Sequence, residues 1–386
     1  MAVKKETKEK LGNVKTVDVN DLYPVFRETG CIPMDLALTN GKGMPVGGSI
    51  LMYAPAGCGK TTIFADMSRC LIENALKRGE DYKIVYVDVE GSRNLLLSMG
   101  LGPYMLSGNL ILKEGSITFS QLEDIYQKVL AWSELDVNDS RNSKHLDEEY
   151  KDVKMIIVDS LSQVQSQALM EKGVDDGDFG SNAKERQRFY GKYFGRCKAA
   201  GVTNLYIAQM RVNLNATGMF DPKEKPAVST SDLFSFDIII KASKSENASN
   251  KDIAKIQVQS AFGTVELQNR CIVTLKSARG KDVKNRYCTL PDMPLLVEYG
   301  KRVVNSYTVR EMLKNFKFIG EKGSGYYTIS ADLADGIELD MNLDKSYRLK
   351  DINVMVTQNL DKIILFLKSR DLFKLLPVEP EYDDGL

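Results

Sequence analysis

The chain has 386 residues, of which 43% are hydrophobic and 27% are charged, enough for one large hydrophobic core and a smaller second one. Lys plus Arg and Asp plus Glu number 52 each, so the net charge is zero and a uniformly basic, histone-like nucleic-acid binder is excluded. The single histidine and the six cysteines, which form no Cys-x-x-Cys pair, exclude His-based triads and His-rich metal sites and speak against zinc sites and a disulfide scaffold. No apolar run reaches the length of a membrane span, so we expect a soluble, cytoplasmic protein without a membrane partner.

The first 28 residues are polar and rich in lysine, and they include a short amphipathic stretch, Asp21–Phe26. A frayed terminus is one interpretation of this segment. From Gly30, apolar runs of strand length alternate with helical patterns, which is typical of an α/β fold with a mainly parallel sheet. The runs are continuous, as expected when helices cover both faces of the sheet. The predicted strands are Ser49–Tyr53, Ile84–Val89, Met155–Asp159, Asn204–Ala208, Asp237–Lys241 and Arg270–Lys276.

Three segments interrupt this alternation. Asp136–Lys154 is charged and is predicted to be a surface excursion, and Glu171–Asn182 is rich in Gly and Asp and is predicted to be mobile. Arg211–Asp232 has few apolar anchors and is predicted to be a long loop. Long loops without secondary structure in a compact domain are usually functional or disordered.

After Val297 the pattern weakens into a small α+β region. Helices are predicted over Thr308–Phe318 and Asn359–Phe373, on either side of the turn-rich piece Gly320–Tyr327, and the chain ends in a short acidic tail. The expected division is an N-terminal segment (1–28), an α/β core (29–300) and a C-terminal region (301–386).

The strongest motif is APAGCGKTT, residues 54–62, which follows a predicted strand and opens a predicted helix, as a phosphate-binding P-loop requires. Glycines let the backbone turn its N–H groups toward phosphate oxygens, and the helix N-terminus adds the positive end of its dipole. Lys60 is expected to reach the β- and γ-phosphates of ATP, and the Thr61 hydroxyl is expected to complete Mg²⁺ coordination. The expected nucleotide contacts in this motif are Ala56, Gly57, Cys58, Gly59, Lys60, Thr61 and Thr62.

Two carboxylates follow apolar strands at the edge where α/β folds bind ligands. Asp159 ends the run MIIVD and is expected to help Thr61 hold Mg²⁺, whereas the simpler interpretation is an aspartate that only terminates a strand. Glu90 follows a second apolar run and is expected to orient and deprotonate the attacking water. A solvated glutamate remains the alternative for Glu90.

Several further segments occur in the order typical of RecA-type homologous recombinases. The chain resembles this family over roughly residues 28–330. It diverges considerably and is closer in character to the phage UvsX-type recombinases than to a bacterial RecA. The segments that carry the resemblance are Glu28–Leu38, Val87–Glu90, Ile157–Ser160, Ile207–Arg211, Gly218–Pro222 and Lys322–Tyr327.

The resemblance implies ATP bound between neighbouring subunits of a helical filament. Gln209 would then sense the γ-phosphate, and Asn94 would contact the adenine. Lys276 and Arg279 would act on the phosphate of the adjacent subunit, but their Lys-x-x-Arg spacing differs from the Lys-x-Lys of the family, so the role of Arg279 is open. Solvated surface cations are the alternative for both.

The resemblance also implies two DNA-binding loops, which fall here on Glu171–Asn182 and on the segment after Gln209. The first loop is acidic, so its phosphate contacts would come from the following helix, whose basic stripe has a solvated face as its alternative interpretation. A single strand is commonly held by such cations together with apolar contacts to bases. The expected DNA contacts are Lys184, Arg188, Lys192, Arg211, Met219, Phe220, Lys223 and Lys225.

The expected activity is that of an ATP-dependent DNA recombinase that forms filaments on single-stranded DNA and pairs it with homologous double-stranded DNA. The N-terminal segment would dock on the next copy of the chain through Leu22, Tyr23, Val25 and Phe26. A single-strand-binding protein and a loader are the expected further partners. The alternatives are a ring-forming helicase of the same fold and a recombination mediator that does not hydrolyse ATP.

Overall fold

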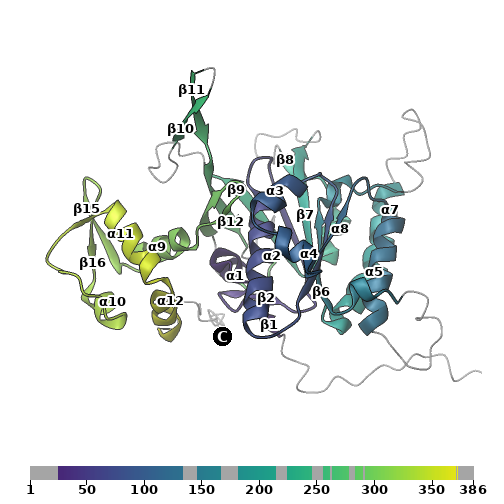
Figure 1. The fold of residues 1–386 in the computed structure, drawn as a ribbon, viewed down its shortest axis with the longest axis horizontal. Coiled ribbons are helices and arrows are strands. Elements are labelled where there is room, and N and C mark those ends of the chain that lie inside the picture. The colour runs from purple at the N-terminus through teal and green to yellow at the C-terminus, as the bar shows by residue number, and fades with distance from the viewer. Residues whose placement is uncertain are drawn as a thin grey trace, which may run out of the picture.

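A computed structural model of the chain describes residues 25–133, 146–166, 181–213, 224–245, 255–260, 263–277, 283–289, 292–370 and 372. Its centre is a ten-stranded sheet with the order β14-β13-β12-β9-β3-β7-β6-β4-β5, with β8 paired to β7 (Figure 1). The strands from β9 to β5 are parallel to their neighbours, whereas β12, β13, β14 and β8 pair antiparallel. The strands are β3 (Ser49–Ala54), β4 (Lys83–Asp88), β5 (Leu110–Glu114), β6 (Val153–Asp159), β7 (Thr203–Val212), β8 (Glu224–Pro226), β9 (Ile238–Lys244), β12 (Arg270–Lys276), β13 (Asp292–Glu298) and β14 (Arg302–Val303).

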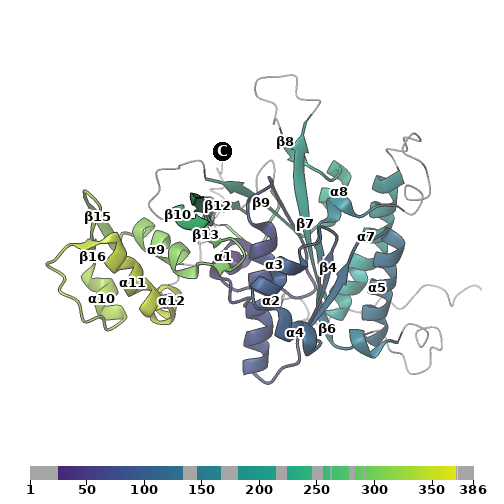
Figure 2. The same cartoon turned by 45° about the horizontal axis from the view of Figure 1, so that its top comes forward.

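Helices cover both faces of this sheet, and a separate hydrophobic core lies on each face (Figure 2). Alternate residues of β3 point to opposite faces, so Ile50 and Met52 join one core while Leu51 and Tyr53 join the other. The first core includes α1 (Ile32–Thr39) and α2 (Lys60–Lys77), and the second includes α5 (Phe119–Ser133) and α7 (Ser181–Ala200). This double coverage explains why the strands are continuous apolar runs.

The strands predicted from sequence are all present, and the expected α/β class with a large, mainly parallel sheet is confirmed. Two boundaries were wrong. The predicted surface excursion ends too late, because Val153 and Lys154 begin β6. A 3₁₀ turn at Glu148–Tyr150 precedes this strand. The part of the excursion up to residue 145 lies outside the described residues. The predicted loop from Arg211 begins inside β7 and its end is ordered as β8 and the short helix α8 (Thr230–Ser235).

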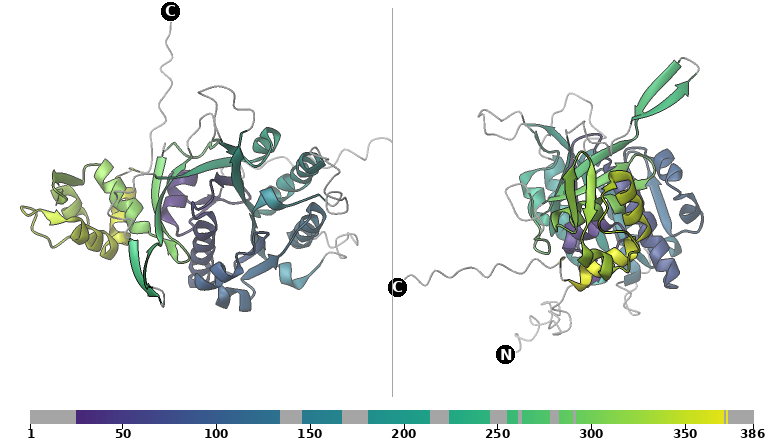
Figure 3. Two further views of the ribbon diagram at one scale, coloured as in Figure 1. Left: turned by 90° about the horizontal axis from the view of Figure 1, so that it is seen from above. Right: turned by 90° about the vertical axis from the view of Figure 1, so that its left-hand side faces the viewer.

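Beyond the antiparallel edge of the sheet lies a smaller α+β arrangement (Figure 3). The predicted helices appear as α9 (Asn305–Asn315) and α12 (Leu360–Ser369), and the turn-rich piece forms the hairpin β15–β16. Its remaining elements were not predicted. The elements between α9 and α12 are β15 (Ile319–Gly323), β16 (Tyr326–Ile329), α10 (Ala331–Gly336), β17 (Tyr347–Arg348) and α11 (Leu349–Gln358). The domain boundaries at residues 28 and 300 stay a prediction.

Several shorter elements complete the described part of the chain. The hairpin β10–β11 (Lys255–Ser260 and Gly263–Gln268) forms a two-stranded sheet of its own, which projects from the main sheet in Figure 1. The helices α3 (Arg93–Ser98) and α4 (Gly102–Leu106) follow β4, and β1 (Phe26–Arg27) pairs with β2 (Met44–Pro45). None of the described helices is both long enough and apolar enough to cross a lipid bilayer.

Phe26, one of the expected inter-subunit contacts, therefore lies in strand β1. Its ring packs edge-on against Tyr287 of the same chain, with 5.7 Å between the ring centroids, whereas Val25 is 67% exposed. Leu22 and Tyr23 lie outside the described residues. Docking on a neighbouring copy stays a prediction, with Val25 as its exposed candidate.

Candidate functional site

The loop between β3 and α2 has the backbone that its sequence predicts. Gly57 and Gly59 adopt φ angles of 74° and 70°, a left-handed conformation that glycine adopts at little cost. Lys60 begins α2 and Cys58 is buried, with the burial raising the pKa of its thiol. Thr62 is also buried, while Ala56 and Gly57 are exposed. The exposed turn at a helix N-terminus is the arrangement that binds phosphate groups.

Lys60 folds back over this loop. Its ammonium donates hydrogen bonds to the carbonyl oxygens of Ala54 (3.1 Å) and Pro55 (3.0 Å). Burial lowers the pKa of Lys60, and the nearby Cys58, Glu90 and Asp159 groups oppose that shift. The cation is thus held beside the loop by neutral acceptors, which a phosphate group can replace.

Thr61 and Asp159 meet as the sequence predicts. The Thr61 hydroxyl donates to Asp159 Oδ2 at 2.7 Å, and the buried Tyr86 hydroxyl donates to the same oxygen at 3.0 Å. Asp159 Oδ1 is buried and has no hydrogen-bond partner among the described residues. Burial raises the pKa of Asp159 to about 6, although the hydrogen bond from Thr61 lowers it.

These groups fit a magnesium ion. A free carboxylate oxygen beside a hydroxyl is the kind of donor set that Mg²⁺ uses when nucleotide phosphates and water complete its shell. Within the described ranges, no group of three or more His, Cys, Asp or Glu residues could hold a metal ion. Thr61 and Asp159, with the unpartnered Oδ1 of Asp159, are residues that could hold Mg²⁺ together with a nucleotide.

Glu90 and Gln209 come from different strands and form a direct contact. Gln209 Nε2 donates to Glu90 Oε1 at 2.7 Å, across 119 positions of sequence. The parallel register explains the meeting, because Ala54 pairs with Gln209 and Asp88 pairs with Asp159, so all these strands end at one edge of the sheet. Glu90 is exposed at this edge, where a water can reach it.

Three further residues support the P-loop and the turn before Glu90, and of these only Asp88 belongs to a sequence motif, the Val87–Glu90 segment. The buried Asp88 carboxylate accepts the backbone N–H of Glu90 at 3.2 Å, which fixes the turn that presents Glu90. The Tyr299 hydroxyl donates to the Gly57 carbonyl at 2.5 Å, and a Cβ atom on Gly59 would lie 2.8 Å from Val297 Cγ1. Tyr299 and Val297 lie more than two hundred residues beyond the loop, so only the fold reveals them.

Three further residues were expected to act on the nucleotide: Asn94, Lys276 and Arg279. Asn94 is exposed in the first turn of α3. Lys276 is exposed at the end of β12, where it pairs with Lys241, and Lys241 pairs with Tyr53 of β3. Lys276 thus lies two strands away from the strand that leads into the P-loop of its own chain. Arg279 lies outside the described residues.

The predicted basic stripe on α7 is only partly available to a ligand. Lys184 and Arg188 are both exposed. Lys192 is bonded to Glu123 of α5 at 3.2 Å and lies over the ring of Tyr193. The cations that a polyanion can reach without breaking a contact in the described structure are thus fewer than the sequence pattern indicates.

Arg211 and Lys225 lie side by side. They are direct cross-strand partners in the β7–β8 pair, and neither is buried. Like charges directly opposite each other on a sheet repel, and an anion bound between them would remove this penalty. Met219, Phe220 and Lys223 are in residues 214–223, which lie outside the described part of the chain.

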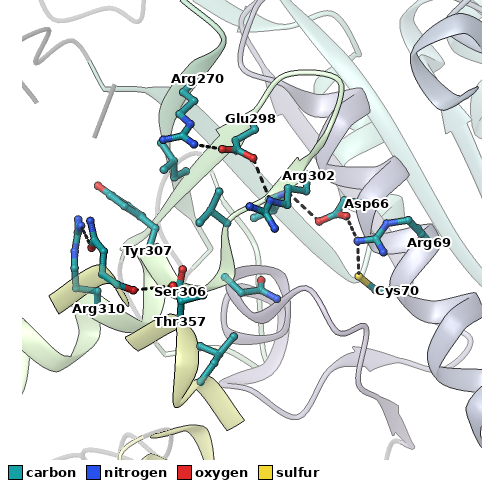
Figure 4. Close-up of a pocket in the computed structure, with 16 residues that line it drawn as sticks. Asp66, Arg69, Cys70, Arg270, Glu298, Arg302, Ser306, Tyr307, Arg310 and Thr357 are labelled. Atoms are coloured by element: carbon teal, nitrogen blue, oxygen red, sulfur yellow. Dashed lines mark hydrogen bonds and ion pairs between the residues drawn. The ribbon is translucent and has the colours of Figure 1, made fainter. Parts of the chain in front are cut away.

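A cleft of about 380 Å³ lies elsewhere, between α2, β13–β14 and the helices α9 and α11 (Figure 4). Most of its charged groups are paired with one another: Glu298 accepts from Arg270 and Arg302, and Asp66 accepts from Arg69, whereas Arg310 is paired with Glu311 outside the lining. None of the predicted nucleotide or DNA residues lines it. We assign it a structural role, joining the sheet to the C-terminal region.

Comparison with known proteins gives a partial relationship. No protein-family model matches the chain. It is 25% identical over 195 residues to Protein RecA of a Nitratiruptor species, which covers 50% of this chain and 48% of that protein. It is 24% identical over 204 residues to Protein RecA of Wigglesworthia glossinidia brevipalpis, covering 53% and 52%. The chain spans about half the length of these curated relatives.

About half of the chain is thus distantly similar to RecA proteins. At these identities and over this coverage, the comparisons support a relationship to RecA proteins, with which the α/β core of the structure is consistent.

Proposed function

We propose that this protein is an ATP-dependent DNA recombinase that polymerises on single-stranded DNA and exchanges it with a homologous duplex. In this proposal it hydrolyses ATP at subunit junctions in response to DNA. It acts in the cytoplasm of a host cell, and its character is that of the phage UvsX-type recombinases. A single-strand-binding protein and a loader are its proposed partners.

The hydrogen bond between Gln209 and Glu90 is the observation that carries this proposal. It joins the expected catalytic base to a residue that lies two positions before Arg211, where β7 pairs with β8 on either side of residues 214–223. In a DNA-dependent ATPase, the group that acts on water must respond to the segment that contacts DNA. A direct bond from Glu90 to the strand that carries Arg211 would supply that response.

The residues divide the chemistry as follows. Backbone N–H groups of the P-loop and the Lys60 ammonium bind the phosphates of ATP. Thr61 and Asp159 would hold Mg²⁺, which when bound would supply positive charge against the phosphate oxygens. Glu90 accepts a proton from the attacking water through its carboxylate, while Gln209 fixes the orientation of that carboxylate. Lys276 and Arg279 belong to the same proposal as cations that act on a neighbouring subunit.

DNA binding is assigned to the cations near β8 and α7. Arg211 and Lys225 lie opposite each other and would bind one phosphate between them. Lys184 and Arg188 would extend this surface, with Lys192 joining once it leaves Glu123. Met219, Phe220 and Lys223 complete the proposed contacts from the intervening segment.

A Lys60→Ala variant tests the nucleotide site. Without the ammonium, ATP hydrolysis should fall at least a hundredfold, both alone and with single-stranded DNA, and ATP-dependent filaments should be lost. Lys77→Ala, in the exposed last turn of the same helix, is the matched control and should stay within twofold of the wild type. DNA-stimulated hydrolysis that survives in Lys60→Ala would contradict the site, and closed rings in place of filaments in electron micrographs would favour a helicase.

A further inference from the structure

One buried carboxylate joins α7 to α8. Asp232, the third residue of α8, is fully buried. Its Oδ2 accepts from Arg186 Nε at 2.9 Å, and its Oδ1 accepts from Gln187 Nε2 at 3.0 Å; both donors belong to α7. Oδ2 also accepts the backbone N–H of Ser229 at 2.8 Å, which closes a capping box at the start of α8. Figure 2 shows α8 beside α7.

Asp232 connects two parts of the chain that carry proposed DNA contacts. α7 carries Lys184 and Arg188, and the β7–β8 pair carries Arg211 and Lys225; these are described cations that the proposed function assigns to DNA. Between β8 and α8, the Ala227 N–H donates to the Gln209 carbonyl at 2.8 Å. Asp232 therefore links α7 to the chain that follows β8, and it lies five residues from Ala227, whose N–H bonds to Gln209.

Apolar packing also holds α8 in place. Phe236, which directly follows α8, is buried and packs on Tyr190, Phe194 and Tyr206 with centroid separations of 5.4, 5.4 and 5.5 Å. These rings fix the C-terminal end of α8 against α7 and β7. The charge of Asp232 acts at the other end of α8, where it sets the orientation of the residues that lead back to β8.

The geometry of the pair suits a positioning role. Arg186 is 11% exposed and Asp232 is fully buried at the side chain, so water screens the interaction little. Arg186 faces into the protein and is therefore unavailable to DNA, although it lies among the basic residues of α7. Because Arg186 bonds to Asp232 inside the protein, it can couple α7 to α8.

We propose that Asp232 is a positioning residue that holds α7 and the chain after β8 together, so that their DNA-contacting cations act as one unit, and that it transmits DNA binding to the Gln209–Glu90 pair. This inference rests on the proposed function. It predicts that loss of the Asp232–Arg186 pair separates DNA binding from ATP hydrolysis, while the nucleotide site itself stays intact.

The test measures ATP affinity, DNA-free hydrolysis and hydrolysis with single-stranded DNA for Asp232→Asn and Arg186→Gln. ATP affinity and DNA-free hydrolysis should stay within about twofold of the wild type, and stimulation by DNA should fall at least tenfold. The double variant should lose no more than either single variant, because both remove the same bond. Arg186→Lys, which keeps a cation beside Asp232, should recover most of the stimulation.

Asp124→Asn on α5 is the matched control, since it makes the same substitution in an exposed pair with Lys128 and should change nothing. If Asp232→Asn does not fold, as judged by circular dichroism, Arg186→Gln decides by the same readings. Full stimulation in a folded variant, an equal loss of ATP affinity, or additive losses in the double variant would each overturn the inference. A wild-type protein that DNA does not stimulate would instead defeat the proposed function.

Discussion

Glu90 lies two residues beyond β4, where its carboxylate is held by the Gln209 side chain. We expect Glu90→Gln to bind ATP and form filaments while hydrolysing ATP about a hundredfold more slowly, since an amide cannot accept the proton of the attacking water. Steady-state hydrolysis and nucleotide binding should be measured on the same preparation. Glu114→Gln, at the end of the neighbouring strand β5, is the control. Wild-type turnover in Glu90→Gln would remove Glu90 from its proposed role.

Asp35 in α1 gives a pH-dependent prediction. Burial raises its pKa to about 7, even though the Thr29 hydroxyl and N–H donate to it at 2.6 and 3.0 Å. The folded state therefore binds a proton more tightly than the unfolded state. It follows that the free energy of unfolding should fall as pH rises from about 4 to about 7, by roughly 2–4 kcal/mol from this group, and then level off.

The contribution of Asp35 is isolated by comparison with Asp35→Asn, which carries no ionisable group. Urea unfolding at pH 5 and at pH 8 should show a relative gain of stability for the variant at the higher pH. An unchanged difference between the two proteins across this range would show that Asp35 is ionised throughout.

At the scale of elements, one contact ties α2 to the antiparallel edge of the sheet. Asp66 on α2 accepts the Val303 N–H of β14 at 2.9 Å and the Arg69 guanidinium at 2.7 Å (Figure 4). Asp66→Ala leaves the buried N–H without its partner, so it should cost about 2–4 kcal/mol of unfolding free energy. Glu73→Ala removes the more exposed partner of Arg69 and should cost less than about 1 kcal/mol. Equal losses, measured by urea denaturation, would contradict this view of the cleft.

The success of sequence reasoning also differs between elements. The buried strands β3, β4, β6, β7 and β9 could be predicted because helices on both faces require unbroken apolar runs. β13 was missed because Pro294 lies inside it, opposite Thr274 of β12, and proline argues against a strand. β8 and α8 were assigned to a loop because three and six residues are too short to show a period.

In the candidate site, too, the features that could be predicted are those that depend on local sequence. The P-loop and the acids at strand ends depend on local sequence, so their meeting at one edge could be predicted from a parallel sheet. The bond from Tyr299 to the P-loop and the Arg186–Asp232 pair depend on which elements become neighbours. Arg186 is one of several basic residues on α7, and its burial becomes evident only from the position of α8 beside it.

In the whole molecule, the two proposed functions meet at one edge of the sheet. The proposed nucleotide residues lie at the carboxyl ends of β3, β4, β6 and β7, and the proposed DNA cations lie on β7, β8 and α7. β7 belongs to both groups, because Gln209 and Arg211 are two residues apart on it. ATP and DNA are thus expected to influence each other through one strand.

Strand exchange between a circular single strand and a homologous linear duplex is the most direct test of the proposed ATP-dependent recombinase activity. With ATP and Mg²⁺ the protein should convert the pair into nicked circular duplex and a displaced linear strand, and neither the reaction without ATP nor Lys60→Ala should yield this product. Absence of exchange by a protein that hydrolyses ATP on single-stranded DNA, or exchange that does not need ATP, would contradict the account.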